Sequence, residues 1–420
     1  MRDPPITCAL LTSHSFDWGT GIALACPGLD FISLSPSAIG LPESPNPFAL
    51  REDDRATVVV LEQSWYRWLT LHHPERVTAV MRKLERCGDI VVGLDAADEF
   101  GLVLPPQVVE EVALVIKPQG LYHDRDLYNY YVGSPYADAL WTEKLRPRQM
   151  RYRDSELEKL RLSVPCFMLD FPAVRRTARA RETGATRVGA RDFSRAERTA
   201  RDLGEGLLWK MTAGTPIGRR RSDVHCLVSL SHVQRLEAMR LLEGFSGSRG
   251  IARIPPTQIG GTEHGYSPLP GEAMAEIVAS AAPYECASVG RMRYLVDLSR
   301  HRIVVAPTGY GELGQRHGGA LWGGAALVCQ DLSHVEMMFP LRDRENVAFC
   351  RPDLSDLRST VEELLRDENL RQRIARQGRR SFRAWAAGWS DHLYTGIEAH
   401  IREALNPGLT RPRSDAPIDL

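Results

Sequence analysis

The sequence predicts an α/β protein with two domains, each built on a doubly wound parallel sheet. Short apolar runs alternate with amphipathic helical segments along most of the 420 residues. The runs are apolar throughout, as expected for parallel strands that helices cover on both faces. A charged stretch without apolar periodicity, residues 175–222, separates two such series. The carboxyl ends of the two sheets should face one cleft, where open α/β sheets bind ligands.

The composition indicates a globular protein and gives no sign of nucleic-acid binding. Hydrophobic residues make up 43% of the chain and charged residues 25%, which is ordinary for a globular enzyme. The 53 basic and 53 acidic side chains cancel. Because nucleic-acid binding depends mainly on Lys and Arg neutralising phosphates, we expect no nucleic-acid partner.

Metal, disulfide and membrane signals are weak. Eight scattered cysteines include no Cys-x-x-Cys pair, so we expect neither a zinc site nor a disulfide framework. The apolar run near the N-terminus is short for a signal peptide, and no stretch approaches eighteen consecutive apolar residues. We therefore expect a cytoplasmic protein without integral membrane association, and leave a homodimer open.

Six candidate strands occupy the N-terminal half, at residues 6–13, 31–34, 57–62, 89–95, 112–118 and 164–171. An amphipathic helix is predicted over 74–88, where Gly88 is placed to end it. Its apolar face consists of Val77, Val80, Met81 and Leu84. We predict residues 1–205 to be the N-terminal domain, with the charged linker 175–222 at its boundary.

The C-terminal half repeats the pattern from residue 223 to 385. Strands are predicted at 224–231, 301–309 and 325–330, with helices at 232–245, 272–281 and 288–299. In the helical segment 355–382, Ser355 is predicted to cap the N-terminus of a helix and Gly378 to end a helix. Its apolar stripe consists of Leu357, Val361, Leu364 and Leu365. A further helix is expected over 386–405, followed by a polar, disordered tail at 406–420.

The segment 300–365 carries the strongest chemical signal. Its strand leads into Pro307 and Thr308, and then into a loop in which Gly309 and Gly311 allow close approach of the backbone to a ligand. The next helix starts near residue 315, so its free N–H groups favour an anion such as a diphosphate. Arg316 in its first turn is suited to clamp a phosphate. Ordinary βα loops also contain such turns, so the order of the following elements matters.

That order resembles the donor domain of transferases with the glycosyltransferase-B architecture, in particular exostosin-like and group-1 glycosyltransferases. The matching parts are Pro307, Gly309, Tyr310, Gly311, Arg316, Gly323, Gly324 and the strand residues 326–328. The resemblance covers residues 224–385. It implies two Rossmann-like domains facing a cleft, with a C-terminal helix that crosses back to the N-terminal domain. It also implies that a nucleotide sugar binds along 308–316.

One position departs from the family pattern. The family usually has an acidic residue three positions after the arginine, where it holds the donor ribose, but this sequence has Gly319, preceded by Gly318. Each glycine costs the helix about 1 kcal/mol relative to alanine. Glu312 or His317 is expected to recognise the ribose instead, with Glu312 favoured, unless the site has been remodelled for another ligand.

Further donor contacts are expected near two other segments. Ser229, at the end of its strand, and Arg235, one turn into the next helix, are candidate phosphate contacts. His264 lies in the Gly- and Pro-rich loop 254–270, which is long enough to suggest a functional loop, and is a candidate contact to base or sugar.

Four residues of the N-terminal half are candidates for the catalytic base. Asp95 and Asp98 follow the strand 89–95, where a carboxylate near the cleft would accept the proton of the acceptor nucleophile. A helix N-cap explains such an aspartate equally well. His14 follows the first strand and His123 the fifth, so both are expected to reach the same space.

Asp124 and Asp126 form an Asp-x-Asp pattern that holds a divalent cation in the other large class of glycosyltransferases. The βα layout argues against that class, so a charged loop is preferred and no metal site is predicted.

The resemblance implies a glycosyltransferase that uses a nucleotide-sugar donor. Because the sequence has neither a membrane segment nor a basic patch, we expect a small soluble acceptor rather than a lipid-linked one, in bacterial specialised metabolism. No cofactor is expected beyond the donor substrate itself. Two alternatives stay open: transfer to a polysaccharide or protein glycan, and a non-catalytic partner protein that binds the nucleotide sugar. Turnover of the donor separates a transferase from a binding protein.

Overall fold

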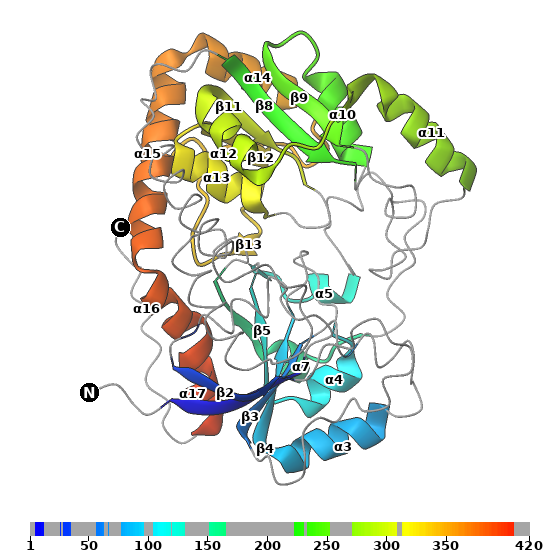
Figure 1. Ribbon diagram of the computed structural model, residues 1–420, viewed down its shortest axis with the longest axis vertical. Coiled ribbons are helices and arrows are strands. Elements are labelled where there is room, and N and C mark those ends of the chain that lie inside the picture. The colour runs from blue at the N-terminus through cyan, green and yellow to red at the C-terminus, as the bar shows by residue number, and fades with distance from the viewer. Residues whose placement is uncertain are drawn as a thin grey trace, which may run out of the picture.

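The computed structural model contains two parallel sheets, one in each half of the chain (Figure 1). It describes residues 5–11, 26, 28–34, 56–62, 66, 77–95, 104–118, 120–130, 151–164, 222–230, 233–252, 271–308 and 313–406. The predicted linker lies outside these residues up to the start of the second sheet at Ser222, as does the tail from residue 407.

The N-terminal sheet has six parallel strands in the order β2-β1-β3-β4-β5-β7. The strands are β1 (Ile6–Leu11), β2 (Leu29–Leu34), β3 (Ala56–Glu62), β4 (Gly88–Leu94), β5 (Leu114–Lys117) and β7 (Leu160–Leu162). The order reverses between β1 and β3, as in doubly wound sheets. The predicted strand 164–171 lies outside the described residues except for Val164, whereas β7 was not predicted because Lys159 and Arg161 interrupt the apolar pattern.

Helices in this half are α3 (Val77–Cys87), α4 (Pro106–Glu111), α5 (Leu127–Tyr130) and α7 (Asp154–Leu157). Met81 and Leu84 of α3 are buried in the core, as their spacing predicts. The helix ends where β4 begins at Gly88.

The C-terminal sheet is also six-stranded and parallel, in the order β10-β9-β8-β11-β12-β14. Its strands are β8 (Ser222–Ser229), β9 (Gly247–Ala252), β10 (Glu285–Cys286), β11 (His301–Ala306), β12 (Ala326–Gln330) and β14 (Ala348–Cys350). In chain order this is the 3-2-1-4-5-6 arrangement of the Rossmann fold, whose switch point lies between the first and fourth strands, here β8 and β11. The predicted class of two Rossmann-like domains is confirmed.

Among the described residues, the helices that accompany this sheet are α10 (Val233–Leu241), α11 (Gly271–Ala281), α12 (Arg291–Arg300), α13 (Gln315–Gly323), α14 (Leu357–Arg366) and α15 (Glu368–Ala387). Two predictions about the segment 355–382 are wrong. Asp356, not Ser355, is the N-cap residue of α14. Gly378 does not end a helix but lies within α15, pressed against the backbone at Asn346.

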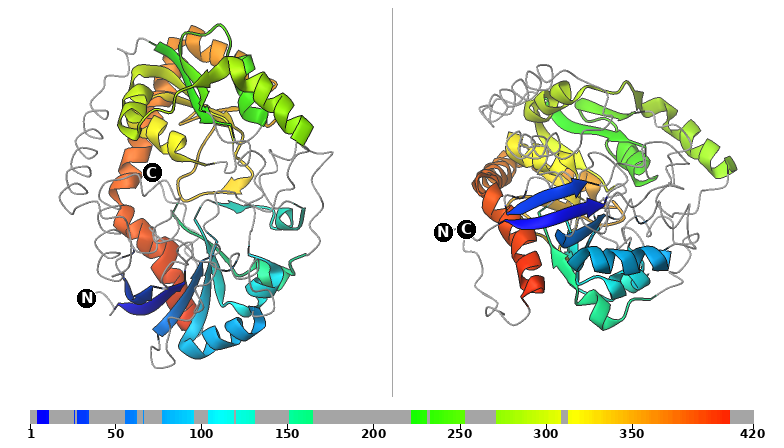
Figure 2. Two further views of the ribbon diagram at one scale, coloured as in Figure 1. Left: turned by 45° about the vertical axis from the view of Figure 1, so that its right-hand side comes forward. Right: turned by 60° about the horizontal axis from the view of Figure 1, so that its bottom comes forward.

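The C-terminal helices connect the two halves along one side of the molecule (Figures 1 and 2). Beyond α15 follow α16 (Trp389–Leu393), the π-helical turn η7 (Tyr394–Glu398) and α17 (Ala399–Leu405). His400 Nε2 lies 3.2 Å from the carbonyl oxygen of Leu162 in the N-terminal half. A side chain at Gly28 would overlap the Glu398 carboxylate, so this glycine allows the helix to lie against the first sheet.

A two-stranded ribbon makes a second junction. β6 (Leu121–Tyr122) from the N-terminal half pairs antiparallel with β13 (Val335–Glu336) from the C-terminal half. Arg125 Nη2 lies 3.3 Å from Glu336 Oε2 beside this pair. One hydrophobic cluster runs through both halves, whereas a second occupies the other face of the C-terminal sheet.

None of the helices within the described ranges is long and apolar enough to cross a membrane.

The packing of Gly378 gives a test of the α15 interface. A Cβ at this position would lie 2.7 Å from the Asn346 carbonyl oxygen and 2.9 Å from Leu321 Cδ2. Alanine would gain about 1 kcal/mol of helix propensity, but overpacking typically costs about 1–3 kcal/mol. We expect Gly378→Ala to lower the melting temperature, measured by circular dichroism. Arg380→Ala, on the exposed side of the same helix, is the control and should change the melting temperature little. A higher melting temperature of the Gly378→Ala protein would contradict the close packing of Gly378 against Asn346 and Leu321.

Candidate functional site

The candidate site lies at the carboxyl ends of β8, β11 and β12, around the switch point of the C-terminal sheet. Arg235 in α10 connects two of these ends: its Nη1 donates to the carbonyl oxygen of Ser229 at 2.9 Å, and its Nε to that of Thr308 at 3.4 Å. The side chain is buried. Two residues predicted as phosphate contacts, Ser229 and Arg235, are therefore adjacent, and both adjoin the predicted donor loop at Thr308.

Gln330, at the end of β12, fixes the same loop from the other side. Its Oε1 accepts the backbone N–H of Thr308 at 2.7 Å. Its Nε2 donates to Gln234 Oε1 at 3.0 Å and to the carbonyl oxygen of Pro352 at 2.9 Å. The sequence analysis missed this residue, because an amide at the end of an apolar strand carries no pattern that reveals its partners.

The first turn of α13, near the same edge of the sheet, contains a buried histidine. Gly314 precedes the helix and donates its N–H to His317 Nδ1 at 3.1 Å. Because Nδ1 accepts, the proton of the neutral ring is on Nε2. This atom is buried and has no hydrogen-bond partner among the described residues. Burial first, and then the Arg316 charge, lower the pKa of His317 to about 3, so the ring stays neutral at physiological pH.

Arg316 is half-buried in the first turn of α13. Within the part of the chain that the structure describes, no salt bridge or hydrogen bond engages its guanidinium. A half-buried cation without a carboxylate, at the positive end of a nine-residue helix, favours an anionic ligand. The expected phosphate clamp thus has suitable surroundings.

The packing of α13 explains the departure at Gly319. A Cβ built there would lie 2.5 Å from Leu298 Cδ1 of α12. Position 319 therefore faces a neighbouring helix, and an acidic side chain would clash there. Ribose recognition, if it occurs at this site, requires another residue. His317 offers a donor at Nε2, whereas Glu312 lies outside the described residues.

A second buried histidine, His225, lies in the C-terminal sheet. His225 of β8 packs edge-on against Tyr294 and His301, with ring centroids 5.4 and 5.1 Å away. Neither of its ring nitrogens has a hydrogen-bond partner among the described residues. Burial, followed by the charges of His301 and Arg316, lowers the pKa of His225 to about 3.

The predicted base Asp95 occupies a closed position in the N-terminal half. Its Oδ1 lies 3.3 Å from Lys117 Nζ, and its Oδ2 accepts the N–H of Leu104 at 3.1 Å. The side chains of Asp95 and Lys117 are both fully buried. A carboxylate with both oxygens engaged and no exposed surface does not suit proton transfer from an external acceptor. This geometry corrects the prediction for Asp95, which holds β4, β5 and the segment before α4 together.

Of the other predicted site residues, His123 is exposed and follows β6, where its backbone N–H donates to the His334 carbonyl oxygen at 3.0 Å. Asp124 accepts the N–H of Asp126 at 3.0 Å, a local turn contact. No cluster of His, Cys, Asp or Glu suited to a metal ion occurs within the described ranges. The remaining predicted site residues lie outside these ranges: His14, Asp98, His264, Gly309, Tyr310, Gly311 and Glu312.

No known family model matches the sequence, and no curated protein matches it. Among solved structures, HepE from Anabaena in complex with UDP and glucose is 9% identical, with a TM-score of 0.47 over 94% of this chain and 100% of its own. T4 phage BGT in complex with its UDP-glucose substrate is 10% identical, with a TM-score of 0.43 over 94% and 99%.

The C-terminal domain of LpcC from Francisella tularensis, a group 1 family glycosyl transferase, is 14% identical, with a TM-score of 0.27 over 42% of this chain and 90% of its own. Similarities at these TM-scores carry no argument about activity or ligand. The fold is assigned from the strand order of the two sheets.

The low pKa of His225 predicts an acid-sensitive stability. As pH falls below about 6.5, the histidine titrates in the unfolded chain, whereas the folded ring stays neutral down to about pH 3. The unfolded state then binds more protons, so the free energy of unfolding falls between pH 6.5 and 3. For one such histidine, the loss at pH 5 is about 2 kcal/mol. His225→Phe keeps the ring packing and should shrink the difference in unfolding free energy between pH 7 and 5, measured by urea titration. An unchanged difference would show that His225 also titrates when folded.

Proposed function

We propose that the protein is a nucleotide-sugar-dependent glycosyltransferase whose C-terminal half binds the donor. The observation that carries this proposal is Arg316, a half-buried cation in the first turn of α13, for which the described residues supply no ion-pair or hydrogen-bond partner. A guanidinium at a helix N-terminus suits a diphosphate. The motif resemblance in residues 300–365 then selects a nucleotide sugar among diphosphate ligands.

In the proposed reaction, a nucleophilic oxygen or nitrogen of the acceptor forms a bond to the anomeric carbon of the sugar. The bond from that carbon to the diphosphate oxygen breaks, and the nucleoside diphosphate leaves. The acceptor proton passes to a base. Negative charge grows on the leaving diphosphate, where Arg316 and the helix N-terminus would stabilise it without a metal ion.

The N-terminal half is proposed to present the acceptor and the base. We propose Asp98 as the base, because Asp95, the other predicted aspartate, is paired with Lys117. His14 and His123 are the next candidates. A small soluble acceptor of specialised metabolism remains the proposed substrate class. A non-catalytic nucleotide-sugar-binding protein is the second candidate, and the closed position of Asp95 favours it, since it removes one of the predicted bases.

Arg316→Ala should weaken the binding of UDP, which the HepE structure contains, by about 1.5–3 kcal/mol, the range for a hydrogen bond to a charged group. Isothermal titration calorimetry of folded protein measures the change, and EDTA should leave binding intact. Arg293→Ala, at an exposed site on α12, is the matched control. Equal affinity of the Arg316→Ala and wild-type proteins would show that Arg316 does not bind the nucleotide. Loss of binding in EDTA would instead support a metal ion held by Asp124 and Asp126.

Asp98→Asn should lower turnover, whereas Asp95→Asn should lower stability. If Asp98 is the base, its substitution lowers turnover by about 10²–10⁴-fold with nucleotide affinity retained. Asp95→Asn leaves the buried Lys117 ammonium without its carboxylate, and breaking such a pair costs about 3–5 kcal/mol of stability. Turnover of a UDP-sugar panel and urea unfolding distinguish the two outcomes. Full turnover of Asp98→Asn would move the base to His14 or His123.

A further inference from the structure

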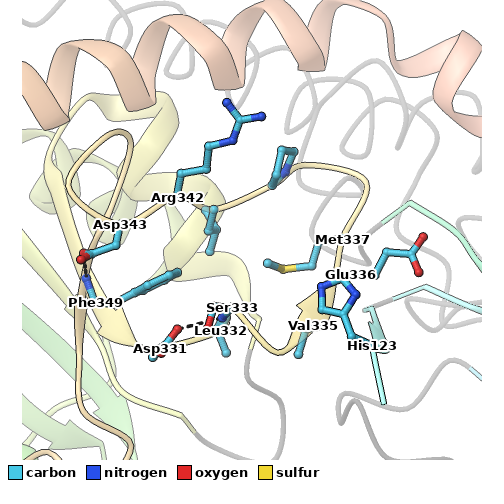
Figure 3. Close-up of a pocket in the computed structure, with 12 residues that line it drawn as sticks. His123, Asp331, Leu332, Ser333, Val335, Glu336, Met337, Arg342, Asp343 and Phe349 are labelled. Carbon is cyan, nitrogen blue, oxygen red and sulfur yellow. Dashed lines mark hydrogen bonds between the residues drawn. The ribbon is translucent and has the colours of Figure 1, made fainter. Parts of the chain in front are cut away.

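A cavity of about 670 Å³ lies beside the ribbon that joins the two halves (Figure 3). It is formed mainly by the segment 331–343, which follows β12, together with Phe349 of β14 and His123 of the N-terminal half. This volume is typical of small-molecule sites. None of the residues of the candidate anion site lines it.

One part of the cavity is suited to an apolar ring. Leu332, Val335 and Leu341 are buried in its wall, and Met337 and Phe349 are half-buried. Figure 3 shows the Phe349 ring and the Met337 side chain directed into the space. An aromatic face and an adaptable thioether together favour a flat or cyclic group.

Two carboxylates are held at fixed positions around the same space. Asp331 Oδ1 accepts the N–H of Ser333 at 2.8 Å, and Asp343 Oδ1 accepts the N–H of Phe349 at 2.8 Å. The second of these bonds holds the Asp343 carboxylate at the backbone of Phe349, the residue whose ring faces the cavity. An ammonium group there would gain both ion pairing and cation–π attraction.

The charges lining the cavity do not cancel. Arg342 Nη1 lies 3.5 Å from Glu345, and the cavity carboxylate of Glu336 is paired with Arg125. Asp331 forms no salt bridge within the described ranges.

The carboxylate of Asp343 is only partly compensated. Its nearest cation, Arg344 Nε, is 3.8 Å away, and Arg344 makes a shorter pair of 2.7 Å with Glu363. The excess charge in the cavity is therefore negative, which opposes a phosphate and favours a cation.

We propose that this cavity binds a small ring-bearing organic cation, with the ring against Phe349 and Met337 and the protonated amine between Asp331 and Asp343. The site is separate from the anion site at α13 and has the opposite charge preference. The inference does not depend on the proposed transferase activity. Since β13 belongs to both the cavity wall and the interdomain ribbon, the ligand would contact the junction of the two halves.

Tryptamine and N-acetyltryptamine form a matched pair of probes, because acetylation removes the charge and keeps the ring. Calorimetric titration of the full chain should show saturable binding of tryptamine, with N-acetyltryptamine weaker by about tenfold or more. The double variant Asp331→Asn/Asp343→Asn should lose affinity for tryptamine by a similar factor. Asparagine keeps the oxygens that accept the Ser333 and Phe349 N–H groups, so the loop should stay folded; circular dichroism verifies this.

Phe349→Leu gives a second variant that leaves both carboxylates in place, and it should also weaken tryptamine binding. Equal affinity for the two probes, undiminished binding by the folded double variant, or no saturable binding of tryptamine to the wild-type chain would each overturn the proposal.

Discussion

The C-terminal half depends on how the ends of β8, β11 and β12 are joined at the switch point. Neighbouring connections leave toward opposite faces of the sheet there, which opens a crevice at the carboxyl ends of the strands. Arg235 and Gln330 span that crevice and hold Thr308 by its carbonyl oxygen and its N–H. Both backbone groups of Thr308 are therefore fixed at the carboxyl end of β11.

The charge of Arg316 affects the histidines near the switch point. His317 is kept neutral by burial and by the charge of Arg316, so its Nε2 remains a donor. The resulting surroundings contain donors and positive charge without a carboxylate among the described residues of α13. The cavity at the segment 331–343 has the opposite character, with carboxylates beside an aromatic ring. The two places are therefore complementary to ligands of opposite charge.

The two halves are coupled through small contacts and one continuous core. The ribbon of β6 and β13 contributes only two residue pairs, whereas the helices from α15 to α17 pack along both sheets. Phe339, Phe382 and Trp385 form an aromatic group beside this path, with ring centroids 5.0–5.7 Å apart. Gly388 separates α15 from α16, and a rearrangement of the halves would have to bend the chain near such a break.

The sequence by itself determined the local elements and the fold class, because burial on one or both faces leaves a period that can be counted along the chain. It predicted strands β8, β11 and β12 of the C-terminal sheet but not β9, β10 or β14. It also predicted the burial of Met81 and Leu84 in α3 and of Leu357, Val361 and Leu364 in α14. Only the tertiary structure decided what distant side chains meet. The closure of Asp95 by Lys117, the contact of Gly319 with α12 and the pairing of β6 with β13 each join segments that lie far apart in sequence. Contacts of this kind depend on how whole elements pack, and no short-range pattern records them.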